Sequence, residues 1–497
     1  MLLFNLYCLI ITFLISQITS SSEKIRFVFE ICRHGARTPY SGLKINENFS
    51  DYFSFNWSGI KELTPLGIRQ HFYLGLRNRI RYLNSLLSDS FDPREILVYS
   101  TNSNRTILSA NAQLQGLYLM SNKLNNSEND NFTKIQPLSE KQIENSDPPD
   151  LNEIYYKNEK EKLGNFSLPF KMTIVPIHLL FSEDHIIQIQ DEKNCPNLKK
   201  IYNKRKKRKE IKIILEKLDE KYSDFIYPII KNNLDFEIKD EKKLFSNNYS
   251  FTYNILDQII CHYTNGFDVI EEHIKKYNEN NKNKENLTIE NLIEDSYEFF
   301  KLDFLSNATD IDEEIGLYSL SPIMEMLINY MKKKVDKDKL NEIYYIGNDV
   351  PKFLFVSAHD STVGGFQAFF KYIDKKFKLN YAYFASNIFI ELFYNCTENF
   401  DNNFDNINES CYYVRFLFDD VVIREYKYEE FYNLIKSNIK DKYEIADYCG
   451  FNAEEVEFDK YFDFYLVSTV LLSCLCLALI MISINLYLKR QKIKKIE

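Results

Sequence analysis

One histidine, His34, stands between two arginines directly after an apolar run near the start of the chain. The seven residues from Arg33 to Pro39 read RHGARTP, and the preceding run 25–32 has the composition of a buried strand. A neutral imidazole can attack phosphorus as a nucleophile. Guanidinium groups can bind phosphoryl oxygens through paired hydrogen bonds and stabilise the charge of the transition state. This segment therefore predicts phosphoryl chemistry at the end of a strand.

Two further segments carry reactive or charged side chains in the same kind of position. Arg105 lies in the stretch NRTILSA after a strand-like run at 96–100, and His359 and Asp360 follow another such run. In open α/β sheets, ligands bind beyond the carboxyl ends of the strands. Although these side chains are far apart in the sequence, we expect them to meet His34 at one edge of a sheet.

The elements that must position these groups alternate along the chain. Strand-like runs are predicted at 26–31, 96–100, 172–176, 353–357, 388–394 and 412–418. Thr64-Pro65 marks the start of a helix, because threonine caps a helix and proline fits its first turn. A second helix is predicted from Asn104 onward. Strands that alternate with helices favour an α/β sandwich.

The middle of the chain has a different character from its two flanks. It is highly charged and poor in strand-like runs, and it shows helical periodicity at 211–227 and 292–304. Pro228 is expected to end the first of these helices. We interpret this region as an inserted, mainly helical cap. The predicted limits are 22–142 and 343–456 for the core and 143–342 for the cap.

The ordered set of motifs resembles the histidine acid phosphatases over about residues 24 to 450. The similarity rests on five segments: RHGxRxP at 33–39, the Thr64-Pro65 helix, Arg105, the pair His359-Asp360, and ASNIFIEL at 385–392. The resemblance implies an α/β fold, a phosphoglycerate-mutase-like three-layer α/β/α sandwich with an inserted mainly helical cap. It also implies similarity to the membrane-anchored lysosomal and prostatic acid phosphatases.

The resemblance implies a role for each residue of these motifs. His34 would form a phosphohistidine, and Asp360 would protonate the leaving alkoxide, which favours acidic conditions. The substrate phosphate would be bound by four side chains: Arg33, Arg37, Arg105 and His359. The arginines should lower the pKa of His34 and keep it nucleophilic at acid pH. No cofactor or metal ion is expected, because the three arginines supply the positive charge.

Each of these side chains has a structural alternative when it is considered singly. The arginines could form surface ion pairs, and Asp360 could be a helix N-cap. Their ordered occurrence after strand ends favours catalysis. The remaining histidines lack such motif support and are interpreted as structural: His71, His178, His185, His262 and His273.

Six cysteines lie outside the apolar segments at the two ends of the chain. Cys396 and Cys411 flank a polar stretch between two strand-like runs and could close a hairpin, although sequence alone leaves the connectivity open. The resemblance implies a disulfide between Cys195 and Cys449. The two others are interpreted as free thiols: Cys32 and Cys261.

The two ends of the chain predict export and membrane anchoring. Residues 1–21 resemble a signal peptide, with an N-terminal anchor as the alternative. Residues 464–488 are uncharged and long enough to span a bilayer, and the basic tail 489–497 is then cytosolic. The prediction is a single-pass type I membrane protein of the secretory or endolysosomal system, with its body lumenal or extracellular. Lys494-Lys495 fits either endoplasmic-reticulum retrieval or an ordinary stop-transfer cluster.

Glycosylation sequons agree with an exported body. Ten N-x-S/T sites lie outside the predicted active-site loop: Asn48, Asn56, Asn125, Asn131, Asn165, Asn248, Asn286, Asn307, Asn395 and Asn408. The formal net charge of −9 argues against nucleic-acid binding, which requires a basic face. The expected partners are small phosphomonoesters, and a homodimer is compatible with the sequence but not required by it.

We predict an acid phosphatase that hydrolyses phosphate monoesters through a phosphohistidine. An inositol-phosphate or lysophospholipid phosphatase on the same scaffold is the first alternative, because leaving-group specificity should reside in the cap. An inactive receptor for phosphorylated ligands is the second, and the intact set of His34, three arginines and Asp360 argues against it. A mutase shares the Arg-His-Gly pattern, but the predicted export signals disfavour it.

Overall fold

The computed structural model of the protein describes residues 23–40, 59–83, 85–118, 173–180, 195–197, 203–204, 206–231, 240–266, 269–305, 310–340, 350–396 and 409–451, together with the single residues 140, 200 and 481. The predicted signal peptide, the cytosolic tail and the segment 464–488 apart from Met481 lie outside these ranges. Within these ranges, no helix combines the length and the apolar character needed to cross a membrane.

A mixed sheet forms the centre of the described chain. Its strands are β1 (Lys24–Arg33), β2 (Ile96–Ser100), β3 (His178–Leu179), β4 (Phe353–Ala358), β5 (Asn387–Tyr394), β6 (Tyr412–Phe418) and β7 (Val421–Lys427). They are ordered β3-β2-β4-β1-β5-β6-β7. The strands β3, β2, β4 and β1 run parallel, whereas β5, β6 and β7 are antiparallel to their neighbours. The parallel half carries the strand ends that the sequence marked for chemistry.

Five of the six predicted strands are confirmed, and one prediction is wrong. The described residues of 172–176 form no strand, and the short strand β3 begins only at His178. Val175 is buried there without strand pairing, and Pro176 has no backbone N–H for a ladder. A further strand, β7, was not predicted. Asp419 and Asp420 between β6 and β7 both have positive φ, as a tight two-residue hairpin turn requires.

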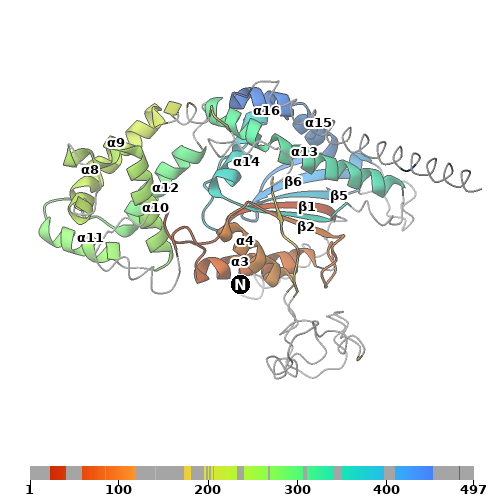
Figure 1. Cartoon of the computed structure of the whole chain (residues 1–497), viewed down its shortest axis with the longest axis horizontal. Coiled ribbons are helices and arrows are strands. Elements are labelled where there is room, and N and C mark those ends of the chain that lie inside the picture. The colour runs from red at the N-terminus through yellow and green to blue at the C-terminus, as the bar shows by residue number, and fades with distance from the viewer. Residues whose placement is uncertain are drawn as a thin grey trace, which may run out of the picture.

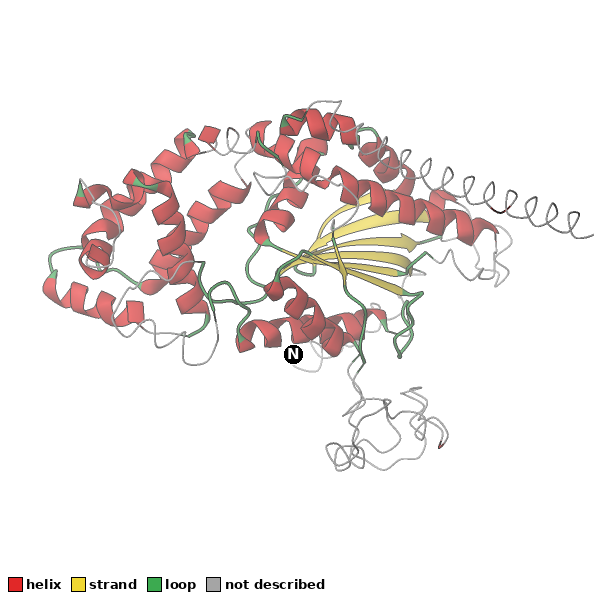
Figure 2. Ribbon diagram, viewed as in Figure 1, coloured by secondary structure: helices red, strands yellow, loops and turns green. Residues whose placement is uncertain are grey.

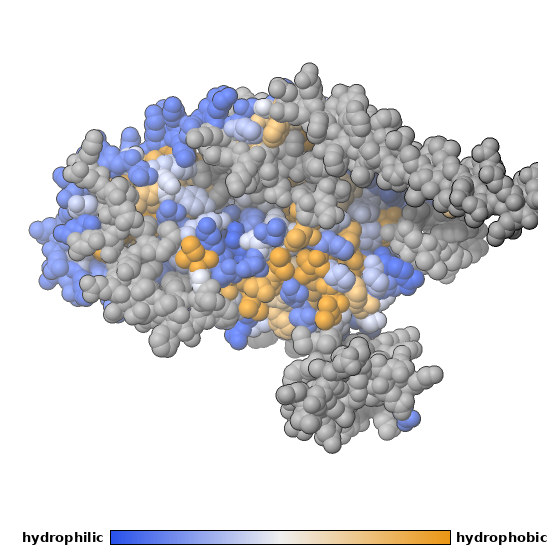
Figure 3. All heavy atoms as spheres, in the orientation of Figure 1, coloured by the Kyte–Doolittle hydropathy of each residue, from blue (hydrophilic) through white to orange (hydrophobic). Residues whose placement is uncertain are grey.

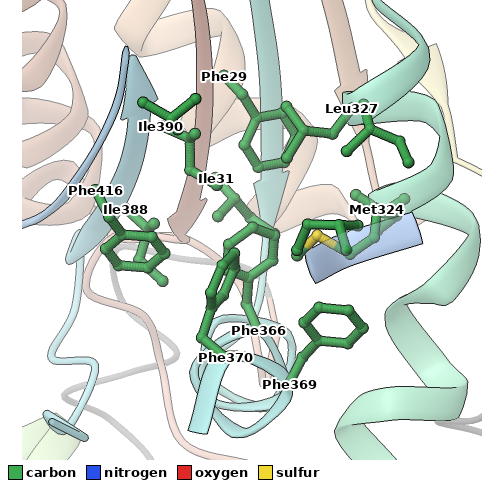
Figure 4. Close-up of a cluster of buried hydrophobic side chains, with 14 of the residues drawn as sticks. Phe29, Ile31, Met324, Leu327, Phe366, Phe369, Phe370, Ile388, Ile390 and Phe416 are labelled. Carbon is green, nitrogen blue, oxygen red and sulfur yellow. The ribbon is translucent and has the colours of Figure 1, made fainter. Parts of the chain in front are cut away.

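Helices cover both faces of the sheet (Figures 1 and 2). On one face lie α3 (Pro65–Tyr82) and α4 (Asn104–Leu117), and on the other α13 (Asp310–Leu340), α14 (Asp360–Ile373) and α15 (Tyr428–Lys436). Side chains of β1 alternate between the two layers, as the period of a strand requires. Phe27, Phe29 and Ile31 join the core under α13 and α14, and Val28 and Cys32 join the core under α3 and α4. Figure 4 shows aromatic and aliphatic side chains interdigitating in the first of these cores.

A second group of helices lies at one end of the sheet (Figure 1). It comprises α8 (Lys209–Ile230), the 3-10 turn η4 (Glu241–Lys243), α9 (Leu244–Asn247), α10 (Tyr249–Thr264), α11 (Val269–Asn280) and α12 (Ile289–Leu305). These helices enclose a hydrophobic core of their own, which includes Phe245, Ile259 and Phe299. Pro228 does not end α8, because it lies in the last turn and the helix continues to Ile230.

The helix α13 falls within the predicted insertion 143–342 but packs in the core beneath the sheet. The packing of α13 does not fix where the insertion begins or ends, so its limits of 143 and 342 stay a prediction. In Figure 3, hydrophilic residues predominate among the coloured atoms of the second helical group, whereas hydrophobic residues gather over α3 and α4. Tyr73, Ile80 and Leu108 are among the exposed apolar side chains of those two helices.

Both predicted disulfides are confirmed. Cys195 pairs with Cys449 at the end of α16 (Lys442–Cys449), and Cys396 pairs with Cys411 in the 3-10 turn η6 (Glu409–Cys411). Asn197 reinforces the first link, since its backbone N–H donates to the Cys449 carbonyl at 3.1 Å. The thiols interpreted as free, those of Cys32 and Cys261, are buried and form no disulfide within the part of the chain that the structure describes.

Candidate active site

The parallel strands bring the predicted residues to one edge of the sheet. In the pairing of β1 with β4, Arg33 lies opposite Ala358, so the residues that follow them, His34 and His359, leave the sheet side by side. The His34 backbone N–H donates to the Ala358 carbonyl at 2.9 Å. β2 pairs with β4 on its other side, and Arg105 lies in the first turn of the helix that follows β2.

The turn after His34 is clamped against the start of α3. Thr64 caps α3 by accepting from the Gly67 N–H at 3.3 Å, and its hydroxyl donates to the Ala36 carbonyl at 3.0 Å. Gly35 and Gly67 are in backbone contact, since a Cβ on Gly35 would lie 2.4 Å from the Gly67 carbonyl oxygen. The Gly35 N–H also donates to the Ser109 hydroxyl of α4 at 3.2 Å. The two helices therefore fix the backbone that carries the nucleophile candidate.

The surroundings of His34 select one tautomer of its ring. Nδ1 lies 2.8 Å from the Gly35 carbonyl oxygen. A carbonyl can only accept, so Nδ1 carries the hydrogen and the lone pair of a neutral ring resides on Nε2. Burial, followed by the charges of Arg33 and Arg37, holds the pKa of His34 well below its usual range. The predicted direction of this pKa shift is confirmed, with burial as its larger cause.

Arg33 and Arg37 are each held by a carboxylate. Nη2 of Arg33 lies 2.8 Å from Oδ2 of Asp360, and its Nη1 donates to the Ala382 carbonyl at 2.7 Å. Arg37 donates through Nη1 and Nη2 to the two oxygens of Asp257, at 3.2 and 2.7 Å. Both guanidinium groups are buried. Because such a fork has a fixed geometry, these ion pairs fix the orientation of the arginines.

Arg105 and His359 form a second hydrogen-bonded group at the same edge. Nη2 of Arg105 donates to the Tyr40 hydroxyl at 3.1 Å and to Nδ1 of His359 at 3.2 Å. Since Nδ1 accepts, the hydrogen of the neutral ring is on Nε2, which donates to the Thr101 hydroxyl at 3.0 Å. Burial, followed by the charge of Arg105, lowers the pKa of His359 to about 3. The rings of the two histidines are 5.6 Å apart.

The same group, the Nε–H, lacks a hydrogen-bond partner among the described residues in each of the three arginines. These Nε atoms, those of Arg33, Arg37 and Arg105, are all buried. A buried donor without a partner costs about 1–3 kcal/mol, so three at one edge indicate a site that is built for an acceptor-rich ligand. Both Nη groups of Arg33 and Arg37, and Nη2 of Arg105, are bound to protein, which leaves the Nε edges to bind such a ligand. A phosphoryl group supplies several acceptor oxygens and the negative charge that these edges favour.

Asp360 begins α14 and sits close to both the arginines and His359. Its Oδ1 accepts from the Ser361 N–H at 2.9 Å, and its Oδ2 binds Arg33. Burial alone would raise the pKa of Asp360, but Arg33 and Arg37 outweigh it and lower this pKa. Asp360 is therefore a carboxylate before substrate binds, whereas its predicted role as an acid requires a proton.

Aromatic side chains surround the nucleophile candidate. The Phe384 ring lies 5.9 Å from the His34 ring and 4.2 Å from the guanidinium carbon of Arg33. The loop before β5 also contributes Tyr381 and Tyr383, whose rings contact each other and that of Tyr297 in α12. These walls exclude water from the charged groups, which strengthens their interactions.

His71 lies beneath the site, as its interpretation as a structural residue suggests. It is fully buried, with Nε2 3.1 Å from the Arg33 carbonyl oxygen and Nδ1 3.0 Å from Oε1 of Gln113. The Gln113 amide in turn donates to the buried carboxylate of Glu30. Burial lowers the pKa of His71 to about 4. His185 lies outside the described residues.

Sequence reasoning missed three residues of the site: Tyr40, Thr101 and Asp257. Asp257 gave a usable signal, because it is a carboxylate inside the apolar run NILDQIICHY, where an unpaired charge is unfavourable. Its partner Arg37 is 220 positions away, so the pairing itself could not be inferred. In the ranges that the structure describes, no three His, Cys, Asp or Glu side chains are grouped so as to hold a metal ion.

Comparison with known proteins defines the class to which this fold and site belong. The chain belongs to the histidine phosphatase superfamily (branch 2), whose family model matches residues 24–419. It is 36% identical to lysosomal acid phosphatase of Xenopus laevis over 115 residues, which are 23% of this chain and 26% of that protein. It is also 35% identical to prostatic acid phosphatase of Bos taurus over 98 residues, 20% of this chain and 24% of the relative.

These alignments span about a quarter of the length of the curated relatives that the chain matches. Among solved structures, the phytase from Citrobacter braakii aligns with 86% of this chain and 99% of its own, at 12% identity and a TM-score of 0.47. The family assignment rests on the family model, which covers all the motif residues and every strand of the sheet except β7.

Proposed function

We propose that this protein is an acid phosphatase that hydrolyses phosphate monoesters through a phosphohistidine. The observation that carries the proposal is a set of three buried arginine Nε donors, none with a partner among the described residues, beside a histidine whose Nε2 bears the lone pair. The donors would bind the phosphoryl oxygens, and His34 would attack the phosphorus atom. Membership of the histidine phosphatase superfamily and partial identity to acid phosphatases support the same reaction.

The reaction would proceed in two displacements. Nε2 of His34 forms a bond to phosphorus as the ester P–O bond breaks, and Asp360 gives its proton to the leaving oxygen. Water then attacks the phosphohistidine, Asp360 takes a proton from that water, and inorganic phosphate leaves with His34 restored. Arg33, Arg37 and Arg105 stabilise the equatorial charge in both steps.

The compartment belongs to the same proposal. The two disulfides support a folded body in an oxidising environment, such as the lumen of the secretory or endolysosomal system or the cell exterior. Partial identity to lysosomal and prostatic acid phosphatases supports the same location. The signal peptide, the single C-terminal anchor, glycosylation and a homodimer remain predictions from the sequence.

Phosphate release from an aryl phosphate by the purified full-length protein tests this function. We expect activity at acid pH that survives a chelator and is lost in His34→Ala, while rapid quenching of the wild type in alkaline denaturant, in which a P–N bond is stable, traps a phosphorylated histidine. A panel of alkyl, inositol and lysophospholipid phosphates would then rank the substrates. A folded wild type that binds phosphate but releases none from any member of the panel would instead indicate a binding receptor.

A further inference from the structure

Asp257 ties the second helical group to the nucleophile turn. It lies on α10, it is 5% exposed, and both of its oxygens are occupied. Oδ1 accepts from Nη2 of Arg37 at 2.7 Å, and Oδ2 accepts from Nη1 of Arg37 at 3.2 Å and from the Tyr40 N–H at 2.9 Å. The carboxylate therefore binds a catalytic-site arginine and the backbone of the same turn.

The five N–H groups of Arg37 are divided between protein and ligand by these contacts. Nη1 donates to Asp257 and to the Thr38 carbonyl at 3.0 Å, and one hydrogen of Nη2 goes to Asp257. The Nε–H has no partner in the described chain. The edge formed by Nε and Nη2 is thus the one that can receive two oxygens of a phosphoryl group.

We propose that Asp257 is a positioning residue that orients Arg37 for phosphoryl binding, an inference that rests on the proposed phosphatase function. Asp360 holds Arg33 in a similar way, but Asp360 also exchanges a proton in the proposed reaction. In this proposal Asp257 takes no part in proton transfer, because it is buried and both of its oxygens are engaged by Arg37, one of them also by the Tyr40 N–H. It fixes one guanidinium throughout the cycle.

Other contacts of α10 support this function of the helix. Nη1 of Arg37 lies 3.4 Å from the Cys261 sulfur, and the Asn265 amide that follows α10 donates to the Arg37 carbonyl at 3.3 Å. Three residues spaced four positions apart, Asp257 and Cys261 on α10 and Asn265 just after it, thus contact Arg37. The helical group completes the phosphate site as well as covering it.

Replacing Asp257 would change phosphate affinity in opposite directions, depending on whether Asp257 positions Arg37 or acts only through its charge. Three arginine charges against the two carboxylates Asp257 and Asp360 leave a net charge of +1, since burial and the arginines keep both histidines neutral. Removing the Asp257 charge would raise this to +2 and attract a phosphate dianion more strongly. Loss of positioning would weaken phosphate binding instead. The sign of the change therefore separates the two functions.

The test compares Asp257→Asn with the wild-type full-length protein. We expect kcat/KM for an aryl phosphate to fall about 100-fold, as displaced catalytic groups commonly cause, and the Kd of inorganic phosphate measured by calorimetry to rise about tenfold. Asp295→Asn is the matched control, because Asp295 is a buried carboxylate of α12 that binds Tyr222 and Lys217 away from the site. It should lower the melting temperature without changing kcat/KM.

A double-mutant cycle with Arg37→Lys tests whether Asp257 acts through that arginine. If it does, Asp257→Asn will cause little further loss in kcat/KM once Arg37 is replaced. Should Asp257→Asn fail to fold, Asp257→Glu keeps the charge and displaces it by one methylene. A loss of about tenfold or more in kcat/KM supports positioning, since such forks tolerate little displacement.

Tighter phosphate binding with unchanged kcat in Asp257→Asn would overturn the proposal, as would full additivity with Arg37→Lys or wild-type kinetics in Asp257→Glu. The calorimetric measurement does not depend on turnover. If the wild type releases no phosphate from any monoester, the phosphatase function fails, and the Kd of phosphate in the Asp257 variants still decides the positioning of Arg37.

Discussion

Asp360 is subject to two opposing demands. In the unliganded site it is paired with Arg33, and the arginines hold its pKa below the ordinary value of 3.8 despite its burial. The proposed mechanism needs it to donate a proton to the leaving oxygen. A bound phosphoryl dianion places negative charge beside Asp360, which raises its pKa in the complex. Substrate binding therefore favours the protonated form of Asp360, and the protonated fraction is larger at low pH.

The pH dependence of kcat follows from this shift. A depressed pKa of His34 keeps the nucleophile neutral on the acid side of its ordinary value of 6.5, so protonation of His34 should not limit the rate at mildly acid pH. Deprotonation of Asp360 in the complex should make kcat for an alkyl phosphate fall as pH rises. The pH profile of kcat, which reports on the enzyme–substrate complex, measures this.

Asp360→Asn should separate substrates by their leaving groups. We expect kcat to fall about 100-fold or more for an alkyl phosphate, the usual contribution of a general acid, and much less for an aryl phosphate with an acidic phenol. The aryl substrate is the internal control, because its leaving oxygen needs no proton. Equal losses for both substrates would contradict the role of Asp360 as an acid.

The residues that the sequence could predict are those that lie in short motifs. His34 and its two arginines lie within a stretch of five residues, and His359-Asp360 are adjacent, so strand-end placement was enough to bring them together. Asp257 lies 220 positions from Arg37, and its contact depends on how α10 is placed against the sheet. Local spacing carries no information on such a placement.

At the scale of elements, the turn after His34 packs so closely against α3 that Gly35 and Gly67 leave no room for a Cβ atom. A Cβ on Gly67 would lie 2.2 Å from the Ala36 carbonyl oxygen and 2.8 Å from its nitrogen, both backbone atoms that cannot rotate away. The predicted capping of α3 by Thr64 is confirmed, but the capping pattern alone does not reveal this contact. The position of the turn after His34 depends on both the Thr64 cap and the contact between the glycines.

Gly67→Ala should therefore damage both stability and catalysis. Overpacking costs about 1–3 kcal/mol of unfolding free energy, and relief of the clash would move the backbone beside His34. Denaturant unfolding and kcat would measure the two effects. Gly365→Ala on α14 is the control, because its Cβ would meet only side chains at 3.7 Å or more, and alanine favours a helix by about 1 kcal/mol. A Gly67→Ala protein with wild-type stability and kcat would show that the turn can move freely.

Strand prediction succeeded where a strand-like sequence is also paired in the sheet. It failed where only one of these two conditions holds. The run at 172–176 has the composition of a strand, yet Val175 packs in the core without a strand partner. Conversely, β7 begins with Val421, Val422 and Ile423 but lies mostly exposed at the edge of the sheet, so it lacks the alternation of apolar and polar residues that marks a half-buried strand. The Asp419-Asp420 turn was the available sequence signal for that hairpin.

At the scale of the whole molecule, the fold combines a stable sheet core with a site that depends on a second helical group. The sandwich and the mainly helical region could be predicted from alternation and composition. The packing of α13 with the sheet could not, because its apolar residues fit either core. The two cores meet at the catalytic edge, where α10 contributes Asp257 and the loop before β5 contributes Tyr381.

Buried histidines set a further property of the whole molecule, its stability at acid pH. Burial lowers the pKa of His71 to about 4 and those of His262 and His359 to about 3. Their unfolded forms bind protons near pH 6.5, so between 6.5 and about 4 the unfolded chain takes up more protons than the fold. The free energy of unfolding must then decrease as pH falls. Glu30 and Asp419, whose pKa values burial raises, oppose this trend, but their ordinary pKa values lie near 4, below most of this range.

We therefore expect the melting temperature to decline from pH 6.5 to pH 4.5, the range in which an acid phosphatase would work. Inorganic phosphate should offset the decline, because it binds the folded arginine site and not the unfolded chain. Thermal unfolding across this range, with and without phosphate, measures both effects. In His34→Ala the arginines remain, so phosphate should still raise the melting temperature although turnover is lost. A melting temperature that rises as pH falls would contradict the neutral state of the buried histidines.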